Sequence, residues 1–200
     1  PTPPYSSAAS DVYKRQITND AIQVFGGYGY TKDQGIEQLF RDNRITPIYE
    51  GTNSVQAIDL VYRKILNNKI FEKYIAQLSN EVKDFAKDNK LSLFADKFFK
   101  YLEILNNFTL WLGEKNKSSK DDVSAACNDY LKVLGYIALA HSWLKILKVS
   151  HSKLKENKTF YEDKINTAKY YFDKILPRVQ SHYLSAITGS DTMMKSNFNW

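Results

Sequence analysis

The sequence is poor in the residues that interrupt helices or cross-link chains. Among its 200 residues are 8 glycines, 5 prolines and one cysteine, and three of the prolines lie within the first four positions. Because glycine and proline disfavour helix interiors, their scarcity indicates long helices. The single cysteine, Cys127, excludes an intrachain disulfide framework and is typical of a reducing compartment. We expect it to be a small buried apolar residue.

Long hydrophobic runs are also absent. A membrane-spanning helix needs roughly 18 or more apolar residues, and the most apolar segment, 133–144, is bounded by Lys132 and Lys145. The net charge is +6, which permits contact with nucleic acid or an acidic membrane surface. The lysines are scattered along helical patterns, however, and this favours a solvated basic surface. No strand-like alternation of useful length occurs, so the predicted fold class is all-α, a helical bundle.

The first sixteen residues stand apart from the remainder. Segment 6–16, SSAASDVYKRQ, looks like the in-frame translation of a sequencing adapter, and residues 1–5 show no periodic pattern. We therefore expect residues 1–16 to be an artefactual or disordered segment and exclude them from the predicted fold.

From Ile17 onward, apolar residues recur at helical spacing. Short helices are predicted over 17–25, over 36–44 with Ile36, Leu39 and Phe40 facing inward, and over 53–66 with Val55, Ile58 and Val61 on one face. A second block of helices is predicted over 71–85, 91–112, 121–149, 160–175 and 179–187, with a polar loop over 113–120 and a frayed end over the last ten residues.

Three local signals refine this second block. The helix over 121–149 is capped by Ser119 or Asp121, and its centre is apolar on nearly all sides, which predicts a central place in the bundle. The segment 159–162 fits a capping box for the next helix. Pro177 should kink or restart the helix in which it lies.

The segment 21–64 combines features of a ligand site. Gly26, Gly27 and Gly29 form either a plain turn or a place where backbone can approach a ligand. Glu50 precedes Gly51, and Thr52 is positioned to cap a helix beginning near Asn53. A carboxylate there is either an exposed charge or a group held beside the positive end of that helix.

Taken together, residues 23–56, QVFGGYGYTKDQGIEQLFRDNRITPIYEGTNSVQ, resemble the C-terminal signature of the acyl-CoA dehydrogenase family. The glycine turn, the E-x-L-x-R-D helix and the IYEGT segment occur in the family's order and spacing. Residues 129–149 and 160–194 resemble the extra C-terminal helical domain of the longer bacterial members, which include the group acting on methylthiopropanoyl-CoA. We therefore expect a C-terminal fragment: 17–68 end the family's C-terminal domain, 69–194 form the helical extension, and 195–200 form a tail.

The resemblance implies FAD-dependent α,β-dehydrogenation of an acyl-CoA thioester. It assigns the catalytic base to Glu50, FAD contacts to Gln23, Gly27 and Thr52, and the acyl pocket to Tyr49 and Gly51. The FAD touched by Gln23 and Gly27 would belong to a neighbouring subunit, which implies a homo-oligomer. Electron-transfer flavoprotein is the expected electron acceptor, and a bacterial cytoplasm is the expected location. The fragment alone is expected to be inactive.

Other chemistries find less support in the sequence. His141, His151 and His182 have no cysteine or carboxylate at metal-ligand spacing, so we expect structural roles for them and no metal site. The alternative to an enzyme is a non-catalytic FAD-binding member of the same family that associates with DNA, for which steeply salt-dependent duplex binding would be the sign. Nucleic acid is otherwise not expected as a partner, and neither is a membrane.

Overall fold

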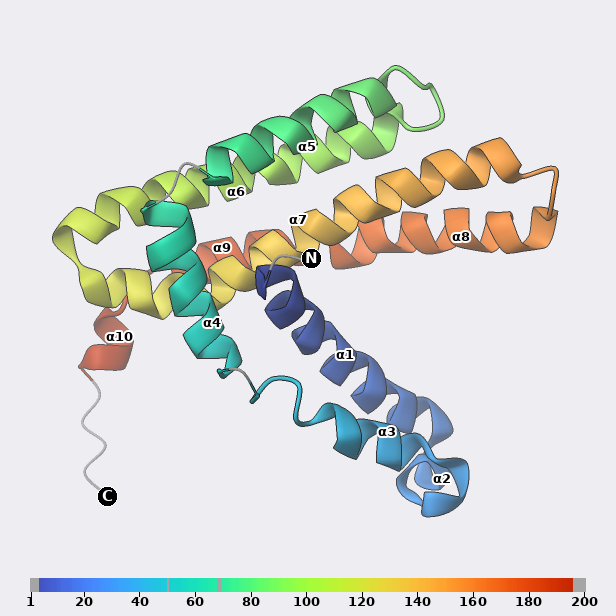
Figure 1. Ribbon diagram of the computed structural model, residues 1–200, viewed down its shortest axis with the longest axis horizontal. Helices are drawn as coiled ribbons and strands as arrows, with labels where there is room; N and C mark the ends of the chain where they lie inside the picture. The colour runs from blue at the N-terminus through green and yellow to red at the C-terminus, as the bar shows by residue number, and fades with distance from the viewer. Residues whose placement is uncertain (1–3, 50, 68–69, 196–200) are drawn as a thin grey trace.

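A computed structural model describes residues 4–49, 51–67 and 70–195, and this part of the chain is helical without strands (Figure 1). The all-α prediction is therefore confirmed. No helix in the described ranges is both long enough and apolar enough to cross a membrane. The helices are α1 (Pro4–Phe25), α2 (Gly27–Tyr30), α3 (Ile36–Asn43), α4 (Asn53–Asp59), α5 (Ile70–Ala86), α6 (Ser92–Ser118), α7 (Lys120–Lys153), α8 (Lys158–Tyr170), α9 (Arg178–Ala186) and α10 (Asp191–Met194). A 3₁₀ turn covers Lys32–Gln34, and π-helical segments cover Leu60–Leu66 and Tyr171–Ile175.

The 34-residue helix α7, about 50 Å long, is the centre of the bundle. It contacts α4, α5, α6, α8 and α9 as well as α1. The side chains of Tyr130, Ile137 and Leu144 along it are fully buried. Phe108 of α6 meets the Tyr130 ring edge-on, with centroids 5.1 Å apart, and the Tyr130 hydroxyl lies 2.8 Å from Thr109 Oγ1. The predicted central position of this helix is confirmed.

The bundle contains two helical hairpins, α5 with α6 and α7 with α8, whose connecting loops lie on the same side of the view in Figure 1. The prediction of a polar loop over 113–120 was wrong, because α6 continues to Ser118 and only Ser119 separates it from α7. This stretch is polar because it is a helix end at the surface. Ser119 is the cap, and its hydroxyl accepts a hydrogen bond from the Asp122 N–H at 3.2 Å.

Other helix ends also differ from expectation. Helix α1 begins at Pro4, well before the predicted Ile17, so backbone of the excluded segment is helical. Helix α8 is capped by Asn157, whose side chain accepts from the Phe160 N–H at 3.2 Å. The predicted capping box at 159–162 is therefore wrong, because these residues already lie within the helix. The last ten residues, expected to be frayed, contain α10. The interruption at Pro177 is confirmed, because it separates the π-helical segment from α9.

Two polar clusters join elements that are distant in the sequence. Glu81 of α5 lies 2.9 Å from both His141 Nε2 and Lys145 Nζ of α7. At the other end, Asp122 Oδ1 accepts from the Ser190 N–H at 2.8 Å and from the Ser190 hydroxyl at 2.7 Å. These clusters fasten α5 and the chain after α9 to α7.

Candidate functional site

The predicted site lies on an arm formed by α1, α2 and α3, which extends away from the bundle and returns to it through α4 (Figure 1). Helix α1 ends at Phe25, where the prediction placed its end, because Gly26 adopts a φ of +60°. The Gly26 N–H donates to the Gln23 carbonyl at 3.1 Å, and the Gly29 N–H donates to the Gly26 carbonyl at 3.0 Å. The glycine run is therefore a tight turn that leads into the single helical turn of α2.

The glycines of this turn have different surroundings. A Cβ added at Gly29 would lie 2.7 Å from the Ile22 carbonyl oxygen, so Gly29 allows the chain to pack against α1. A Cβ added at Gly26 or Gly27 would meet nothing within 4 Å, and both residues are exposed. Of the two interpretations left open by the sequence, internal packing accounts for Gly29. The backbone at Gly26 and Gly27 is open to an external ligand.

Helix α3 carries the charged part of the family signature. Arg41 binds Glu37, one helical turn earlier, through Nε at 2.7 Å and Nη2 at 3.3 Å. This pairing raises the pKa of Arg41 above its ordinary value. Asn43 at the end of α3 donates to Thr18 Oγ1 at 3.4 Å and so links α3 to α1. The partner of Arg41 is therefore within its own helix.

The loop that leads into α4 is closed by backbone hydrogen bonds. The Tyr49 N–H donates to the Ile45 carbonyl at 3.1 Å, and the Asn53 N–H donates to the Pro47 carbonyl at 3.3 Å. Gly51 has a φ of +98°, a conformation that favours glycine. The predicted base, Glu50, lies outside the described residues. Its neighbour Tyr49 is 45% exposed.

Helix α4 begins at Asn53, as predicted, and Thr52 is confirmed as its cap. The Thr52 Oγ1 accepts from the Val55 N–H at 3.4 Å, while its own O–H donates to no acceptor among the described residues and could donate to a ligand. A single donor–acceptor hydroxyl can therefore both start the helix and bind an anionic group. The positive end of α4 faces the same region.

Contacts that the sequence did not predict hold α4 on the bundle. Asn128 Nδ2 of α7 donates to Ser54 Oγ at 3.1 Å. The Tyr62 hydroxyl donates to the Lys120 carbonyl at 3.0 Å and lies 3.2 Å from Ser124 Oγ. No local pattern signals these pairs, because their members are more than fifty residues apart in the sequence. The Ser54 contact fixes the entrance of α4 relative to α7, and the Tyr62 contacts fix the π-helical segment that follows α4.

The predicted cofactor residues fall into two groups. Gln23 and Gly27 lie at the free end of the arm, whereas Thr52 lies where the chain returns to the bundle (Figure 1). Helix α3 and the loop after it separate the two groups along the arm. Within one copy of the chain, the described residues therefore do not place Gln23 and Gly27 beside Thr52.

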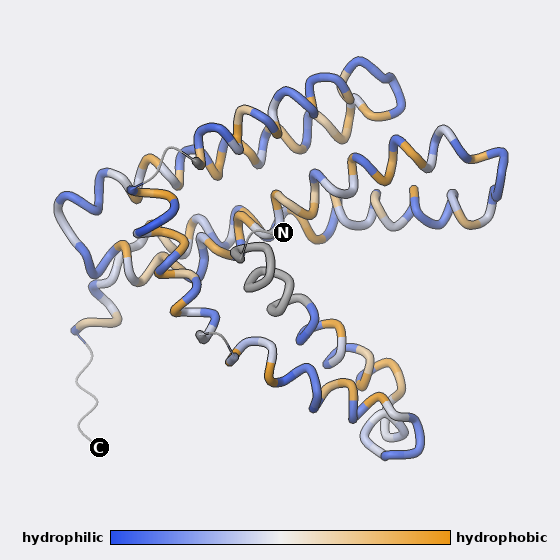
Figure 2. The backbone as a smooth tube through the Cα atoms, viewed as in Figure 1, coloured by the Kyte–Doolittle hydropathy of each residue, from blue (hydrophilic) through white to orange (hydrophobic). Residues whose placement is uncertain are grey.

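Apolar side chains on the arm are largely uncovered. Within residues 14–49 only Gly29 is buried, whereas Val24 is 85% and Tyr30 is 83% exposed. In Figure 2, hydrophobic stretches alternate with hydrophilic ones along α1 and α3. Leu39, predicted to face inward, is 57% exposed, and the predicted apolar face over 53–66 is only partly buried. Of the predicted face, Val61 is buried, together with Ala57 and Leu60, whereas Val55 and Ile58 are exposed.

The histidines of the bundle have roles in packing and hydrogen bonding. His141 binds Glu81, and the His182 Nδ1 lies 2.9 Å from Asp129 Oδ1 while its ring stacks on Tyr136 with centroids 5.9 Å apart. Across the described residues, no group of three or more His, Cys, Asp or Glu side chains could hold a metal ion. Cys127 is buried as expected, and burial raises the pKa of its thiol to about 11.

Comparison with known families accounts for this architecture. The family described as acyl-CoA dehydrogenase, C-terminal domain, matches residues 9–66, and the one described as acetyl-CoA dehydrogenase C-terminal like matches residues 78–197, more than half of the chain. The chain belongs to the acyl-CoA dehydrogenase family. The first match covers the arm and α4, and the second covers most of the bundle.

Individual relatives agree with the family match. A butyryl-CoA dehydrogenase of Syntrophomonas wolfei is 30% identical over 173 residues, which cover 81% of this chain and 28% of that protein. A cyclohexane-1-carbonyl-CoA dehydrogenase of Syntrophus aciditrophicus is 58% identical over 50 residues, 25% of this chain and 13% of that protein. A 3-(aryl)acrylate reductase of Clostridium sporogenes is 63% identical over 41 residues, 20% of this chain and 11% of that protein. The chain thus spans little more than a quarter of even the most extensively matched of these three.

Proposed function

We propose that this chain is the C-terminal part of an FAD-dependent acyl-CoA dehydrogenase that oxidises the α,β bond of an acyl-CoA thioester, with Glu50 as the base. The observation that carries the proposal is the loop around position 50. It is closed between the Pro47 carbonyl and the Asn53 N–H, it passes through the positive-φ Gly51, and it ends at the capped entrance of α4. In a family member, this is the segment that carries IYEGT.

The dehydrogenation reaction places two requirements on this loop. The α-proton of a thioester is weakly acidic, so the base must reach it directly in a site from which water is excluded. Negative charge develops on the thioester oxygen as the proton leaves, and backbone N–H groups aimed at that oxygen stabilise it. Bound FAD would supply the hydride acceptor. Tyr49, about half exposed in this chain, and Gly51 would line the acyl pocket and be covered by it.

The residues assigned to FAD fit contact with such a group. The exposed backbone of Gly26 and Gly27 has no side chain in its way, and the Thr52 hydroxyl retains a donor. Because the glycine turn and Thr52 stand apart along the arm, one copy of the chain would contribute to two different cofactor sites. This arrangement supports a homo-oligomer in which the glycine turn serves the neighbouring subunit.

The uncovered arm supports the same assembly. Single exposed apolar residues are ordinary, but α1 to α3 carry six exposed large apolar side chains, Ile17, Val24, Phe25, Tyr28, Tyr30 and Leu39, which favours a surface for another polypeptide. We propose that other domains and a second subunit cover it in the full enzyme. The 200-residue chain alone is then inactive toward acyl-CoA, and finding tightly bound FAD with turnover would contradict this.

The test is acyl-CoA-dependent flavin bleaching in the full-length parent enzyme. Glu50→Gln keeps the size of the side chain but removes the base, and we expect bleaching to slow by about 10²–10⁴-fold. The matched control is Glu72→Gln, an exposed carboxylate of α5, which should bleach like the unmodified enzyme. Equal bleaching rates in the Glu50→Gln variant and this control would refute the assignment.

The DNA-associated alternative rests on net charge alone and remains a prediction. Duplex binding whose affinity falls steeply between about 50 and 200 mM salt would support it. Bleaching that is lost in the Glu50→Gln variant would favour the enzyme.

A further inference from the structure

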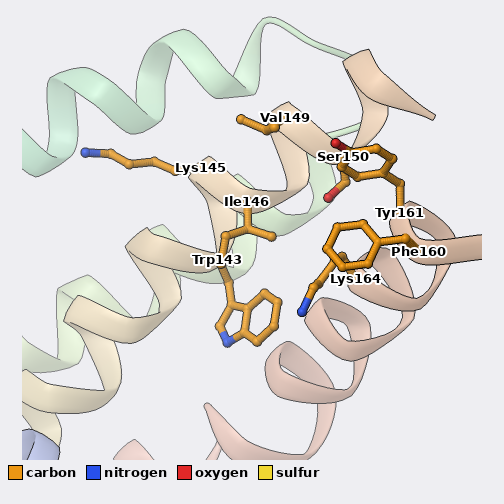
Figure 3. Close-up of a pocket in the computed structure, with 8 residues that line it drawn as sticks. All are labelled: Trp143, Lys145, Ile146, Val149, Ser150, Phe160, Tyr161 and Lys164. Carbon is orange, nitrogen blue, oxygen red and sulfur yellow. The ribbon is translucent and has the colours of Figure 1, made fainter. Parts of the chain in front are cut away.

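A pocket lies between α7 and α8, towards the closed end of that hairpin (Figure 3). It is open to the surface and has a volume of about 430 Å³, within the range of small-molecule sites in proteins. Its walls are mainly apolar, and they come from Trp143, Ile146 and Val149 of α7 and from the rings of Phe160 and Tyr161 of α8. The pocket is part of the bundle and is separate from the arm that carries the proposed dehydrogenase residues.

One deeply buried polar group of this pocket, the hydroxyl of Ser150, has no hydrogen-bond partner within the described residues. Ser150 is 1% exposed, and Figure 3 shows its oxygen directed into the space between α7 and α8. Two other serines of α7 behave differently, because Ser142 donates to the Ala138 carbonyl at 3.0 Å and Ser152 donates to the Val149 carbonyl at 2.8 Å. Burying a hydroxyl without an acceptor is unfavourable. An acceptor supplied by a ligand would remove that cost.

The charged residues of the lining, Lys145 and Lys164, are both basic, and the Lys145 side chain points away from the pocket (Figure 3). Lys145 on its edge is held by Glu81 at 2.9 Å. Lys164 forms no ion pair with any carboxylate in the described ranges, and its ammonium lies 5.2 Å from the centre of the Phe160 ring. The lining contains no acidic residue. A ligand that offers an oxygen to Ser150 is therefore favoured if it is also anionic.

We propose that this pocket binds a small amphiphilic carboxylate, with its aliphatic or aromatic body against the Trp143 and Phe160 rings and its carboxylate oxygens accepting from Ser150 and Lys164. Apolar walls provide the area for the body of such a molecule, and the two donors distinguish it from a neutral hydrocarbon. The proposal does not depend on the proposed dehydrogenase function, because none of its residues lies on the arm.

The test is a titration of the 200-residue chain with decanoate, followed by the fluorescence of Trp143. The substitutions Trp111→Phe and Trp200→Phe leave Trp143 as the single reporter. We expect a saturable change in its emission. Ser150→Ala should weaken binding about tenfold, the loss of one hydrogen bond to a charged group. It should also leave the melting temperature of the ligand-free chain unchanged or higher, since no internal hydrogen bond is removed.

Charge recognition is tested with Lys164→Gln and with decanol as a neutral analogue. We expect Lys164→Gln to weaken decanoate binding several-fold and to remove the preference for decanoate over decanol. The matched control is Lys174→Gln, an exposed lysine further along the same helical run that does not line the pocket. Absence of a saturable change up to the solubility limit of decanoate would overturn the proposal. So would equal affinity in the unmodified chain, the Ser150→Ala variant and the Lys164→Gln variant, or a lower melting temperature for ligand-free Ser150→Ala.

Discussion

Replacing Asp122 by alanine should destabilise the bundle through a single identifiable cluster. Asp122 is 9% exposed and accepts hydrogen bonds from the N–H and hydroxyl of Ser190, which is itself 6% exposed. Its Oδ2 also accepts a hydrogen bond from the Lys115 ammonium at 2.8 Å. The adjoining Gly189 has a φ of +82°, and a Cβ there would lie 3.0 Å from Asp122 Oδ1, so the chain passes close to the carboxylate.

The magnitude follows from what the substitution leaves behind. Each buried donor left unpaired costs about 1–3 kcal/mol, and Ser190 contributes two donors. The contact with the half-exposed Lys115 adds at most about 1 kcal/mol. Partial access of water reduces the sum, so we expect Asp122→Ala to lose about 3 kcal/mol of unfolding free energy. For a chain of this size that lowers the melting temperature by about 6–12 °C.

The measurement is urea unfolding followed by helical circular dichroism, with Asp121→Ala as the matched control. Asp121 is exposed in the same first turn of α7, so both variants lose one negative charge near the helix N-terminus, an effect of about 0.3–1 kcal/mol. A difference of less than about 1 kcal/mol between Asp122→Ala and Asp121→Ala would show that the Ser190 hydrogen bonds do not stabilise the fold, contrary to the argument above.

Two further predictions use the same approach. Gly29→Ala should destabilise the arm by about 1–3 kcal/mol because the added Cβ would clash with the Ile22 backbone. Gly27→Ala, which has open space around it, should leave the arm's stability unchanged. Amide exchange in α1 and α2 measures the stability of the arm in both variants. A hydrogen bond from Lys145 lowers the pKa of Glu81 to about 2, and burial lowers the pKa of His141. Stability should therefore fall as the pH drops below about 6.5 and again below about 4.5, and Glu81→Gln should flatten the lower branch of urea midpoints against pH.

Much of the fold could be predicted because apolar residues at helical spacing indicate which segments form helices. The centre of the helix over 121–149 is apolar on nearly all sides, which identified it as the central helix, and Ile137 and Leu144 within it are fully buried. Helix ends were harder to predict. The polar stretch before Ser119 contains residues typical of a loop, but α6 continues through it because a surface helix end is solvated in the same way.

Some features of the candidate site could be predicted from the sequence and others could not. The cap at Thr52 was predictable because it depends only on residues three positions apart. The role of Gly29 was not, because it depends on where Ile22 lies across the turn. The exposure of Val55 was missed because periodicity shows that a residue is apolar but not what covers it. The roles of Glu50 and the FAD residues come from family resemblance and remain predictions.

The central position of α7 has a consequence for how the bundle unfolds. Since α5, α6, α8 and α9 all rest on this one helix, none can separate without exposing apolar surface on a shared neighbour. Amides throughout the bundle should then exchange with solvent at a common, slow rate set by complete opening. The arm shares little of that core, so its amides should exchange orders of magnitude faster until another polypeptide shields them.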